Sequence, residues 1–262
     1  NALVALNTPY TDGFETMPEV TITRDSMGIS PDEHWDYANT APDTARLRSL
    51  VNDSITISGN RSVSMDVNLN MPGAQNYLLG TFNLSGYDTA TAEIRIDYDY
   101  RIAGKPKFTA GNQVWARAAD NDNLPWILIK DYDTSSIPGL VYNSGTLSLT
   151  DAMKACSRDF GSALQVRFGQ RDSGLIAMKG YGNGMSIDNF RIYLIQHDVQ
   201  LLGIVGPQVR ECGLGNSVPL TVKIYNSVNQ VQDTVAVFYQ LDNGPVVTDT
   251  IASIAAKDTI VY

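Results

Sequence analysis

Residues 92–100 read Ala-Glu-Ile-Arg-Ile-Asp-Tyr-Asp-Tyr, so apolar and charged side chains alternate along the chain. Because successive side chains of a β-strand point to opposite faces, the alternation predicts a strand whose Ile94, Ile96 and Tyr98 face a core. Similar alternating segments lie at residues 55–58, 62–67 and 164–168. Gly, Pro, Asn and Asp separate these segments at short intervals, which favours an all-β sandwich over alternating strands and helices.

Two segments are candidates for short helices. Residues 150–156 read Thr-Asp-Ala-Met-Lys-Ala-Cys, which predicts one or two helical turns with Thr150 as the N-terminal cap. Residues 42–51 are the second candidate, although their charges and flanking loop residues fit a helix less well.

A domain boundary is predicted between Tyr193 and Asp198. Residues 186–195 have the pattern of a closing strand, and a new β pattern begins at Asp198. We therefore expect a first β-sandwich over residues 1–196 and a second domain over residues 197–262. The second domain offers four or five strands, whereas a complete immunoglobulin-like sandwich has roughly seven, so we expect it to be incomplete.

The composition excludes several classes of function. The 262 residues are 43% hydrophobic, and the net charge is −9 with no cluster of Lys and Arg, which argues against a nucleic-acid partner. No run approaches the roughly 20 apolar residues that span a bilayer, so no direct membrane span is expected. Cys156 and Cys212 are too few for a zinc cluster. A disulfide between them would join the two domains, and the sequence leaves that pairing open.

Several short motifs, taken in order, resemble two known kinds of domain. Asp12-Gly-Phe-Glu near the start, Leu164-Gln-Val-Arg-Phe-Gly-Gln and Gly184-Met-Ser-Ile-Asp-Asn-Phe-Arg-Ile-Tyr resemble a MAM-like or concanavalin-like jelly roll. The later segments Glu211-Cys-Gly-Leu-Gly, Val222-Lys-Ile-Tyr-Asn and Gly244-Pro-Val-Val-Thr-Asp-Thr-Ile resemble the CARDB-type immunoglobulin-like repeats of large Bacteroidota surface proteins.

This resemblance implies an extracellular, non-catalytic module of a larger secreted protein. Such proteins are exported by the type IX secretion machinery and serve as adhesins, gliding-motility proteins or filament components at the cell surface. Their expected partners are surface glycans or other subunits of a surface assembly. The alternative is a carbohydrate-binding accessory domain of a secreted hydrolase or protease.

The resemblance also implies a structural cation. In MAM-like jelly rolls the Glu of the Phe-Glu pair and the Asp of the closing Ile-Asp segment can share Ca²⁺, and Glu15 and Asp188 match these positions, with Asp12 as a possible third ligand. The two carboxylates could meet if the first and last strands are neighbours, and a calcium ion would remove their repulsion. The competing interpretation places both on solvated loop edges. Residues 120–123, Asp-Asn-Asp-Asn, are a second calcium candidate that turn chemistry explains equally well.

The three tryptophans are candidates for an aromatic platform that stacks on sugar rings. Trp115 and Trp126 lie among apolar residues and are expected to pack in the core. Trp35 lies in a polar segment, so we expect it to be the exposed ligand contact.

The triplet Asp-Ser/Thr-apolar recurs along the chain and resembles the acceptor for O-glycosylation in Bacteroidota. A glycan must stay hydrated on a surface turn or strand edge. The competing interpretation is that Asp before a β-branched residue marks turn-to-strand transitions. The candidate acceptors are Ser26, Thr44, Ser54, Thr89, Thr234, Thr250 and Thr259.

Catalysis is the least favoured class. His34 and His197 are the only histidines, and no nucleophile elbow, zinc-protease motif or phosphate loop is present. Glu93, Asp97 and Asp99 alternate along one strand and could in principle hydrolyse glycosides. They are better explained as the outward face of a strand, so we expect no enzyme activity.

Overall fold

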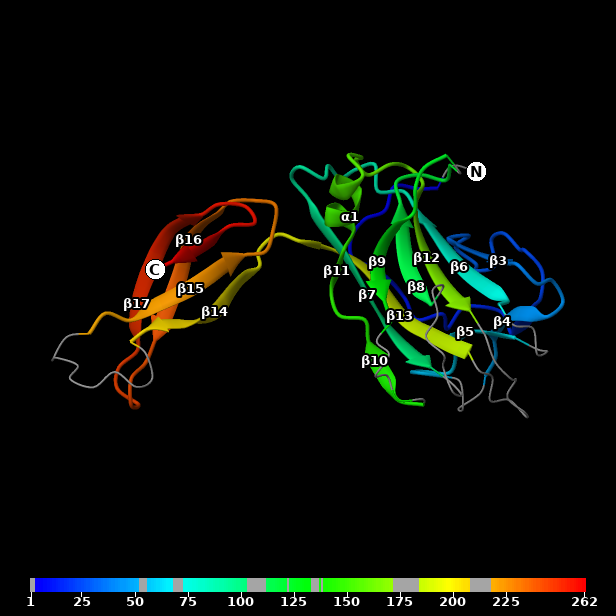
Figure 1. The fold of residues 1–262 in the computed structure, drawn as a ribbon, viewed down its shortest axis with the longest axis horizontal. Helices are drawn as coiled ribbons and strands as arrows, with labels where there is room; N and C mark the ends of the chain where they lie inside the picture. Colours follow the sequence, from blue (N-terminus) through cyan, green and yellow to red (C-terminus); the bar gives the residue numbers. More distant parts are fainter. Residues whose placement is uncertain are drawn as a thin grey trace. The chain divides into compact units, whose positions relative to one another are not determined.

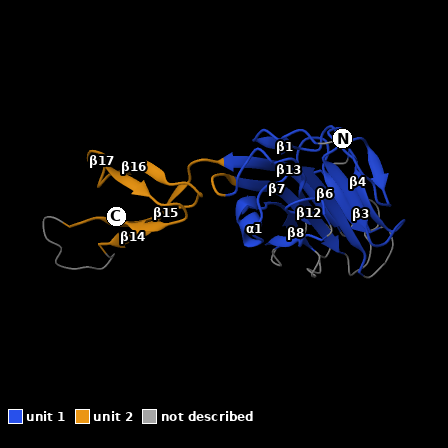
Figure 2. Cartoon of the chain, turned by 90° about the horizontal axis from the view of Figure 1, so that it is seen from above, with its two compact units in different colours: residues 1–89, 94–194 blue, residues 90–93, 195–262 orange. Residues whose placement is uncertain are grey.

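The computed structural model divides the chain into two compact units (Figures 1 and 2). Unit 1 comprises residues 1–89 and 94–194, and unit 2 comprises residues 90–93 and 195–262. The structure describes residues 3–51, 56–67, 73–102, 112–121, 123–132, 137, 139–171, 184–207 and 218–262.

One layer of unit 1 is an antiparallel sheet of eight described strands. Their order is β10-β7-β13-β5-β4-β2, with β1 paired to β13 and β11 paired to β7. The strands are β1 (Tyr10–Asp12), β2 (Val20–Ile22), β4 (Ala45–Ser49), β5 (Val63–Val67), β7 (Glu93–Ile102), β10 (Val141–Asn143), β11 (Leu147–Ser148) and β13 (Gly184–Ile195).

The other layer has five described strands in the order β3-β6-β12-β8-β9, all antiparallel. Figures 1 and 2 together show this sheet stacked on the eight-stranded one. Its strands are β3 (Trp35–Asn39), β6 (Gln75–Phe82), β8 (Gln113–Arg117), β9 (Ile127–Asp131) and β12 (Leu164–Arg171).

The core of unit 1 is an aromatic cluster between the two sheets. The rings of Trp35, Phe82, Phe168 and Phe190 are fully buried and lie with centroids 5.1 to 6.1 Å apart. Gly80 makes room for this packing, because a Cβ atom there would lie 2.7 Å from the ring of Phe82 and 2.8 Å from that of Trp35. The close approach of rings to backbone therefore requires glycine at this position.

The one helix among the described residues is α1 (Leu149–Ala155). A helix was predicted here, but the cap is Ser148 rather than Thr150: the Ser148 hydroxyl accepts a hydrogen bond from the Asp151 N–H at 2.9 Å. The Thr150 hydroxyl instead accepts from the N–H of Ile94 at 2.8 Å, inside the fold. No described helix has the length and apolar character needed to cross a bilayer.

The helix considered for residues 42–51 was wrong. Residues 45–49 form β4, which pairs with β2 on one side and β5 on the other. Ala45 and Leu47 are fully buried, so pairing in the sheet outweighs the weak helical pattern.

Unit 2 is a smaller pair of antiparallel sheets. One consists of β14 (Val199–Gly206), β15 (Thr221–Asn226) and β18 (Thr259–Val261), and the other of β16 (Gln232–Tyr239) and β17 (Val247–Ile254). Val222 and Ile224 from the first sheet pack with Ile251 and Ile254 from the second. The fold class predicted from the sequence is therefore confirmed: a jelly-roll-like β-sandwich is followed by a smaller, immunoglobulin-like β-sandwich.

Candidate functional site

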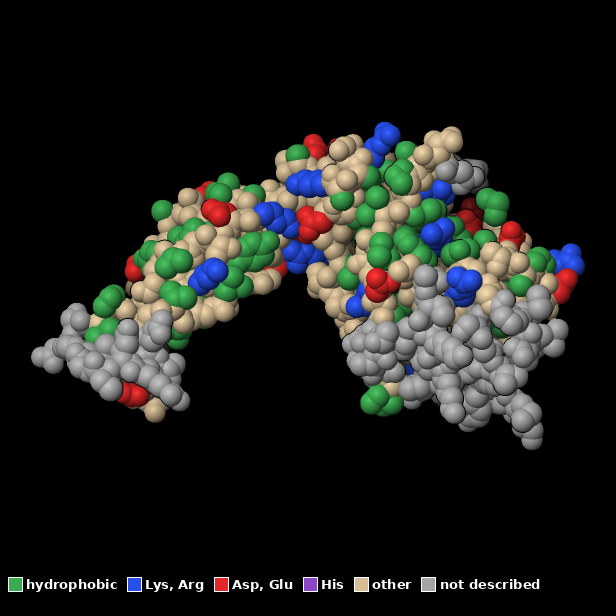
Figure 3. Space-filling view, viewed as in Figure 1, with side chains coloured by type: hydrophobic (Ala, Val, Ile, Leu, Met, Phe, Trp, Pro, Cys, Tyr) green, Lys and Arg blue, Asp and Glu red, His purple; other side chains and the backbone are tan. Residues whose placement is uncertain are grey.

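The outer face of the five-stranded sheet carries the most distinctive group of side chains in unit 1. Along β12, Val166 and Phe168 are fully buried in the core, so Arg167 between them points to the opposite face. In the sheet register Arg167 lies opposite Trp115 of β8, and Gly169 lies opposite Tyr77 of β6. Figure 3 looks onto this sheet and shows hydrophobic and basic side chains side by side over its strands.

Three aromatic rings surround the guanidinium group of Arg167. Its Cζ atom lies 4.1 Å from the ring centre of Trp126, 4.4 Å from that of Trp115 and 4.7 Å from that of Tyr77. All four side chains are half-buried. We call Tyr77, Trp115, Trp126 and Arg167 the platform cluster. Such stacking holds both the rings and the cation in place, because the ring faces attract positive charge.

Arg117 contacts one ring of the platform cluster. Its Cζ lies 4.4 Å from the ring centre of Trp126. Its Nε donates to Gln165 Oε1 at 3.0 Å, Nη1 donates to the Asn121 carbonyl at 3.0 Å, and Nη2 pairs with Asp120 at 3.3 Å. With only 4% of its surface exposed, Arg117 has a structural role.

A groove of about 540 Å³ opens on the same face of the sheet. Asp36 and Thr81 line it. In the sheet register Asp36 lies opposite Leu79, which in turn lies opposite Arg167, and Thr81 lies opposite Gln165. Burial raises the pKa of Asp36, and the negative charge of Asp120 raises it further. The other polar lining residues are Glu33, Asp120 and Ser162.

This combination of groups suits the recognition of a sugar. Aromatic faces pack against the apolar C–H faces of a ring, while a guanidinium group and carboxylates hydrogen-bond to its substituents. The geometry offers a binding surface, with rings at one end and acidic groups at the other.

The structure reverses the expectations for the three tryptophans. Trp35 is fully buried, and its indole N–H donates to Asp12 at 2.8 Å, so the prediction that it is exposed was wrong. Its strand pairs with β6 and turns its ring into the core. Trp115 and Trp126, expected inside, are half-buried in the platform cluster. Trp115 faces outward because Val114 and Ala116, its neighbours in β8, are fully buried.

The three carboxylates of the calcium prediction lie where the first and last strands of unit 1 meet. β1 pairs with β13, which places Asp12 opposite Phe190. Glu15 and Asp188 both approach Gly13, where a Cβ atom would lie 4.0 Å from Glu15 Cγ and 3.9 Å from Asp188 Oδ1. Asp12 accepts hydrogen bonds from the N–H of Phe14 and from Trp35.

Backbone and hydroxyl donors already hold both carboxylates. Asp188, fully buried, accepts from the N–H groups of Ser58 and Asn189 and from the Ser62 hydroxyl, at 2.7 to 2.9 Å. The exposed Glu15 accepts from the N–H groups of Asn60 and Arg61. Burial nevertheless raises the pKa of Asp188. Among the described residues no three His, Cys, Asp or Glu side chains are grouped as a metal site.

The predicted glycosylation acceptors differ in exposure. Thr234, Thr250 and Thr259 in unit 2 are exposed, and Ser26 and Thr44 are half-buried. Thr89 is 8% exposed and its N–H donates to Asp159, so it lacks the exposure that a glycan requires. Ser54 lies outside the described residues, as do Asp122 of the second calcium candidate and Cys212 of the possible disulfide.

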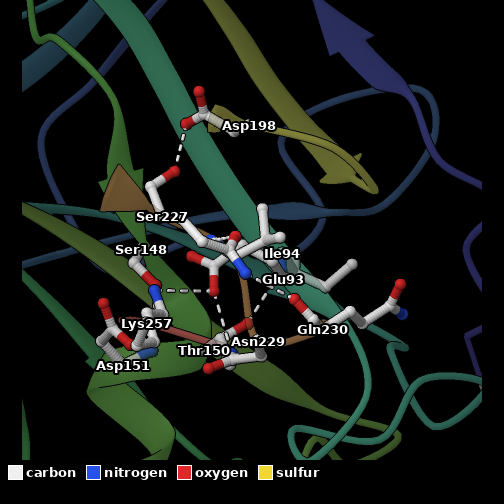
Figure 4. A network of polar contacts seen from close by, with 12 residues as sticks. Glu93, Ile94, Ser148, Thr150, Asp151, Asp198, Ser227, Asn229, Gln230 and Lys257 are labelled. Atoms are coloured by element: carbon white, nitrogen blue, oxygen red, sulfur yellow. Dashed lines mark hydrogen bonds and ion pairs between the residues drawn. The ribbon is translucent and has the colours of Figure 1, made fainter. Parts of the chain in front are cut away.

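The three carboxylates that could in principle hydrolyse glycosides form ion pairs or hydrogen bonds within the protein. Asp97 pairs with Arg191, and Asp99 accepts hydrogen bonds from Asn143 and Asn189 at 2.8 Å. Glu93 does not face solvent as its alternation suggested: it is 1% exposed and belongs to unit 2. Figure 4 shows its contacts there, with Lys257 at 3.0 Å and Asn229 at 2.9 Å.

No protein-family model matches the sequence, and no curated protein matches it. Solved structures match at low similarity. A cyclase from Fischerella sp. TAU has 10% identity over 70% of this chain and 93% of its own, with a TM-score of 0.41. The adhesin domain of Lys-gingipain from Porphyromonas gingivalis W83 has 13% identity over 71% and 98%, with a TM-score of 0.35.

A third match is a carbohydrate-binding module studied for specific mannan recognition, with 14% identity over 67% of this chain and 97% of its own and a TM-score of 0.33. This chain also spans 19% of the length of a matched tailspike protein from bacteriophage CBA120. With TM-scores below 0.5, these similarities support no functional argument, which must come from the site itself.

Proposed function

We propose that unit 1 is a non-catalytic carbohydrate-binding module whose ligand lies on the outer face of the five-stranded sheet. The observation that carries this proposal is the platform cluster, in which three rings from separate segments converge on one arginine at an outward sheet face. Core packing does not explain the cluster, because a hydrophobic core would not place a cation among the rings. An ordinary solvent-exposed sheet face does not explain it either, because such a face seldom gathers three aromatic rings.

A binding role explains the polar groups as well. The groove supplies carboxylates that can accept hydrogen bonds from sugar hydroxyls, and Thr81 and Ser162 add hydroxyl groups. The side chains lie on regular strands and are fixed by stacking and by the hydrogen bonds of Arg117. A preorganised surface of this kind binds without a large entropic cost.

The test is glycan-array binding followed by titration of the best ligand. Trp126→Ala removes the ring that contacts both arginines and should weaken binding by about tenfold or more, which corresponds to about 1.4 kcal/mol. The matched control is Tyr193→Ala, which removes the ring under Arg191 on the other sheet. Wild-type affinity in a folded Trp126→Ala variant would refute the assignment of this face.

We further propose that the module acts at a cell surface in adhesion or display. The resemblance to Bacteroidota surface proteins supports export by type IX secretion and glycosylation at the exposed Thr234, Thr250 and Thr259. Intact-mass measurement of the natively produced protein checks the modification. A mass equal to that of the unmodified chain would contradict the proposed glycosylation.

Structural calcium near Gly13 remains a proposal beside this one. It is supported by the approach of Glu15 and Asp188 to the same point, and by the raised pKa of the buried Asp188. Calcium should raise the melting temperature of the wild type over that in a chelator, and Glu15→Gln should abolish the difference. Equal melting temperatures in both solutions would show that the hydrogen bonds suffice.

A further inference from the structure

Arg117 and Arg167, the two arginines that contact Trp126, differ in how their N–H groups are satisfied. Arg117 donates to Gln165 and to the Asn121 carbonyl and pairs with Asp120. Arg167 donates no hydrogen bond to any described residue and pairs with no described carboxylate, and its Nε is buried without a partner. Arg167 is therefore a positive charge held by rings alone.

Ring stacking leaves the hydrogen-bonding capacity of Arg167 unused. Three rings contact the guanidinium group of Arg167, and no described oxygen accepts a hydrogen bond from its N–H donors. Burial also disfavours the charged form and lowers the pKa of Arg167. The half-buried guanidinium group lacks an acceptor among the described residues, so an acceptor supplied by a ligand would bring a gain that a satisfied arginine could not.

Three carboxylates on this face have partners other than Arg167. Asp120 pairs with Arg117, and Asp36 accepts from the Gly28 N–H at 2.7 Å. Asp131 accepts from the side-chain amide of Gln113. Among the described residues none of these carboxylates neutralises Arg167, which leaves the charge available to a ligand.

We propose that the ligand of this face is an acidic saccharide whose carboxylate binds edge-on to Arg167 while its ring packs on the platform cluster. This inference rests on the proposed function and names its ligand class. A carboxylate is planar and can accept two parallel N–H bonds from a guanidinium group, so it would satisfy donors that no described residue takes up. A sulfated sugar shares the negative charge but not the planar shape.

The acidic groove fixes the orientation of such a ligand. Glu33, Asp36 and Asp120 repel a negative group but accept hydrogen bonds from hydroxyls. The acidic sugar therefore lies at the Arg167 end and neutral hydroxyls lie toward the groove.

The experiment compares galacturonic acid with its methyl ester, which keeps the sugar ring and removes the charge. In titrations of the whole chain, the acid should bind at least about tenfold more tightly, and added NaCl should weaken this binding but not that of the ester. A galactose 6-sulfate arm distinguishes sulfate from carboxylate, since a preference for galactose 6-sulfate over galacturonic acid would overturn the carboxylate assignment.

The variant Arg167→Met keeps an apolar chain among the rings and removes the donors. It should bind the acid and the ester equally, whereas Arg191→Met, at the matched stack on the other sheet, should behave as the wild type. If Arg167→Met does not fold, the comparison of acid, ester and salt in the wild type still decides. Equal wild-type binding to the acid and the ester overturns the acidic ligand alone, whereas failure to bind any glycan on the array overturns the proposed function with it.

Discussion

Arg167 and Arg191 occupy similar settings on opposite sheets of unit 1, and the difference between them is informative. Each stacks on aromatic side chains of an outward face, Arg191 at 4.3 Å from the ring of Tyr193. Arg191 also pairs with Asp97, whereas Arg167 has three rings and no described carboxylate. Within the described part of unit 1, the charge of Arg191 is therefore neutralised by a carboxylate of the protein, whereas that of Arg167 is left for a ligand.

The largest expected effect comes from removing a buried carboxylate that pairs with two arginines. Asp66 is 1% exposed and pairs with Arg46 at 2.6 Å and with Arg48. Asp66→Asn keeps the shape but removes the charge, so the free energy of unfolding should fall by about 3 to 5 kcal/mol. Urea denaturation measures it. A loss below about 1 kcal/mol would show that the fold tolerates the two arginines without this carboxylate, and it would weaken the contrast with Arg167.

The second effect comes from removing a ring instead of a carboxylate. Trp126 contacts both Arg167 and Arg117, so Trp126→Ala should lower the free energy of unfolding by about 1 to 2 kcal/mol through lost cation–π contact. Trp126→Phe keeps a ring and should lose less than half of that. If the two variants melt at the same temperature, the ring faces do not hold the arginines.

A smaller effect is expected at the exposed pair. Arg191 has 47% of its side chain exposed and Asp97 has 14%. Asp97→Asn should cost about 0.5 kcal/mol, because solvent screens such a pair, and the cost should shrink in high salt. A cost as large as that of Asp66→Asn would mean that solvent does not screen this pair.

The smallest effect concerns the acidic groove. Because the pKa of Asp36 is raised in the folded protein, the folded state holds its proton to a higher pH than the unfolded chain does. The ionised form is therefore penalised, and stability falls as pH rises from the ordinary aspartate value of about 4 through the raised one. Asp36→Asn should melt slightly higher than the wild type at pH 7 and equally at pH 4. A lower melting temperature at pH 7 would contradict this sign.

Local pattern was enough to predict the strands. Ile94, Ile96 and Tyr98 are fully buried as the alternation around them requires. The alternation of side chains along a strand also predicts one residue of the site: Arg167 lies between Val166 and Phe168 and must face away from them. What the rule could not supply is the partner across the sheet: the contact with Trp115 depends on the pairing of β8 with β12, about 50 residues apart.

The wrong predictions of burial for Trp115, Trp35 and Glu93 share one physical cause. Val114-Trp-Ala is apolar on both faces of its strand, so periodicity cannot tell which face is the core. Trp35 lies among polar residues but is carried into the core by its pairing with β6. Glu93 continues an outward alternation, yet Asn229 and Lys257, more than 130 residues later, bury it. Each outcome depends on contacts remote in sequence.

The contacts of Glu93 bear on how the two units could be exchanged by gene recombination. Unit 2 takes residues 90–93 from the middle of the chain in addition to 195–262, and Lys257 pairs with Glu93 across that gap. Gene recombination that joins the chain at a single point near residue 195 would transfer the later strands without these four residues. The immunoglobulin-like unit is therefore not encoded by one continuous segment, and moving residues 195–262 alone would leave Glu93 behind.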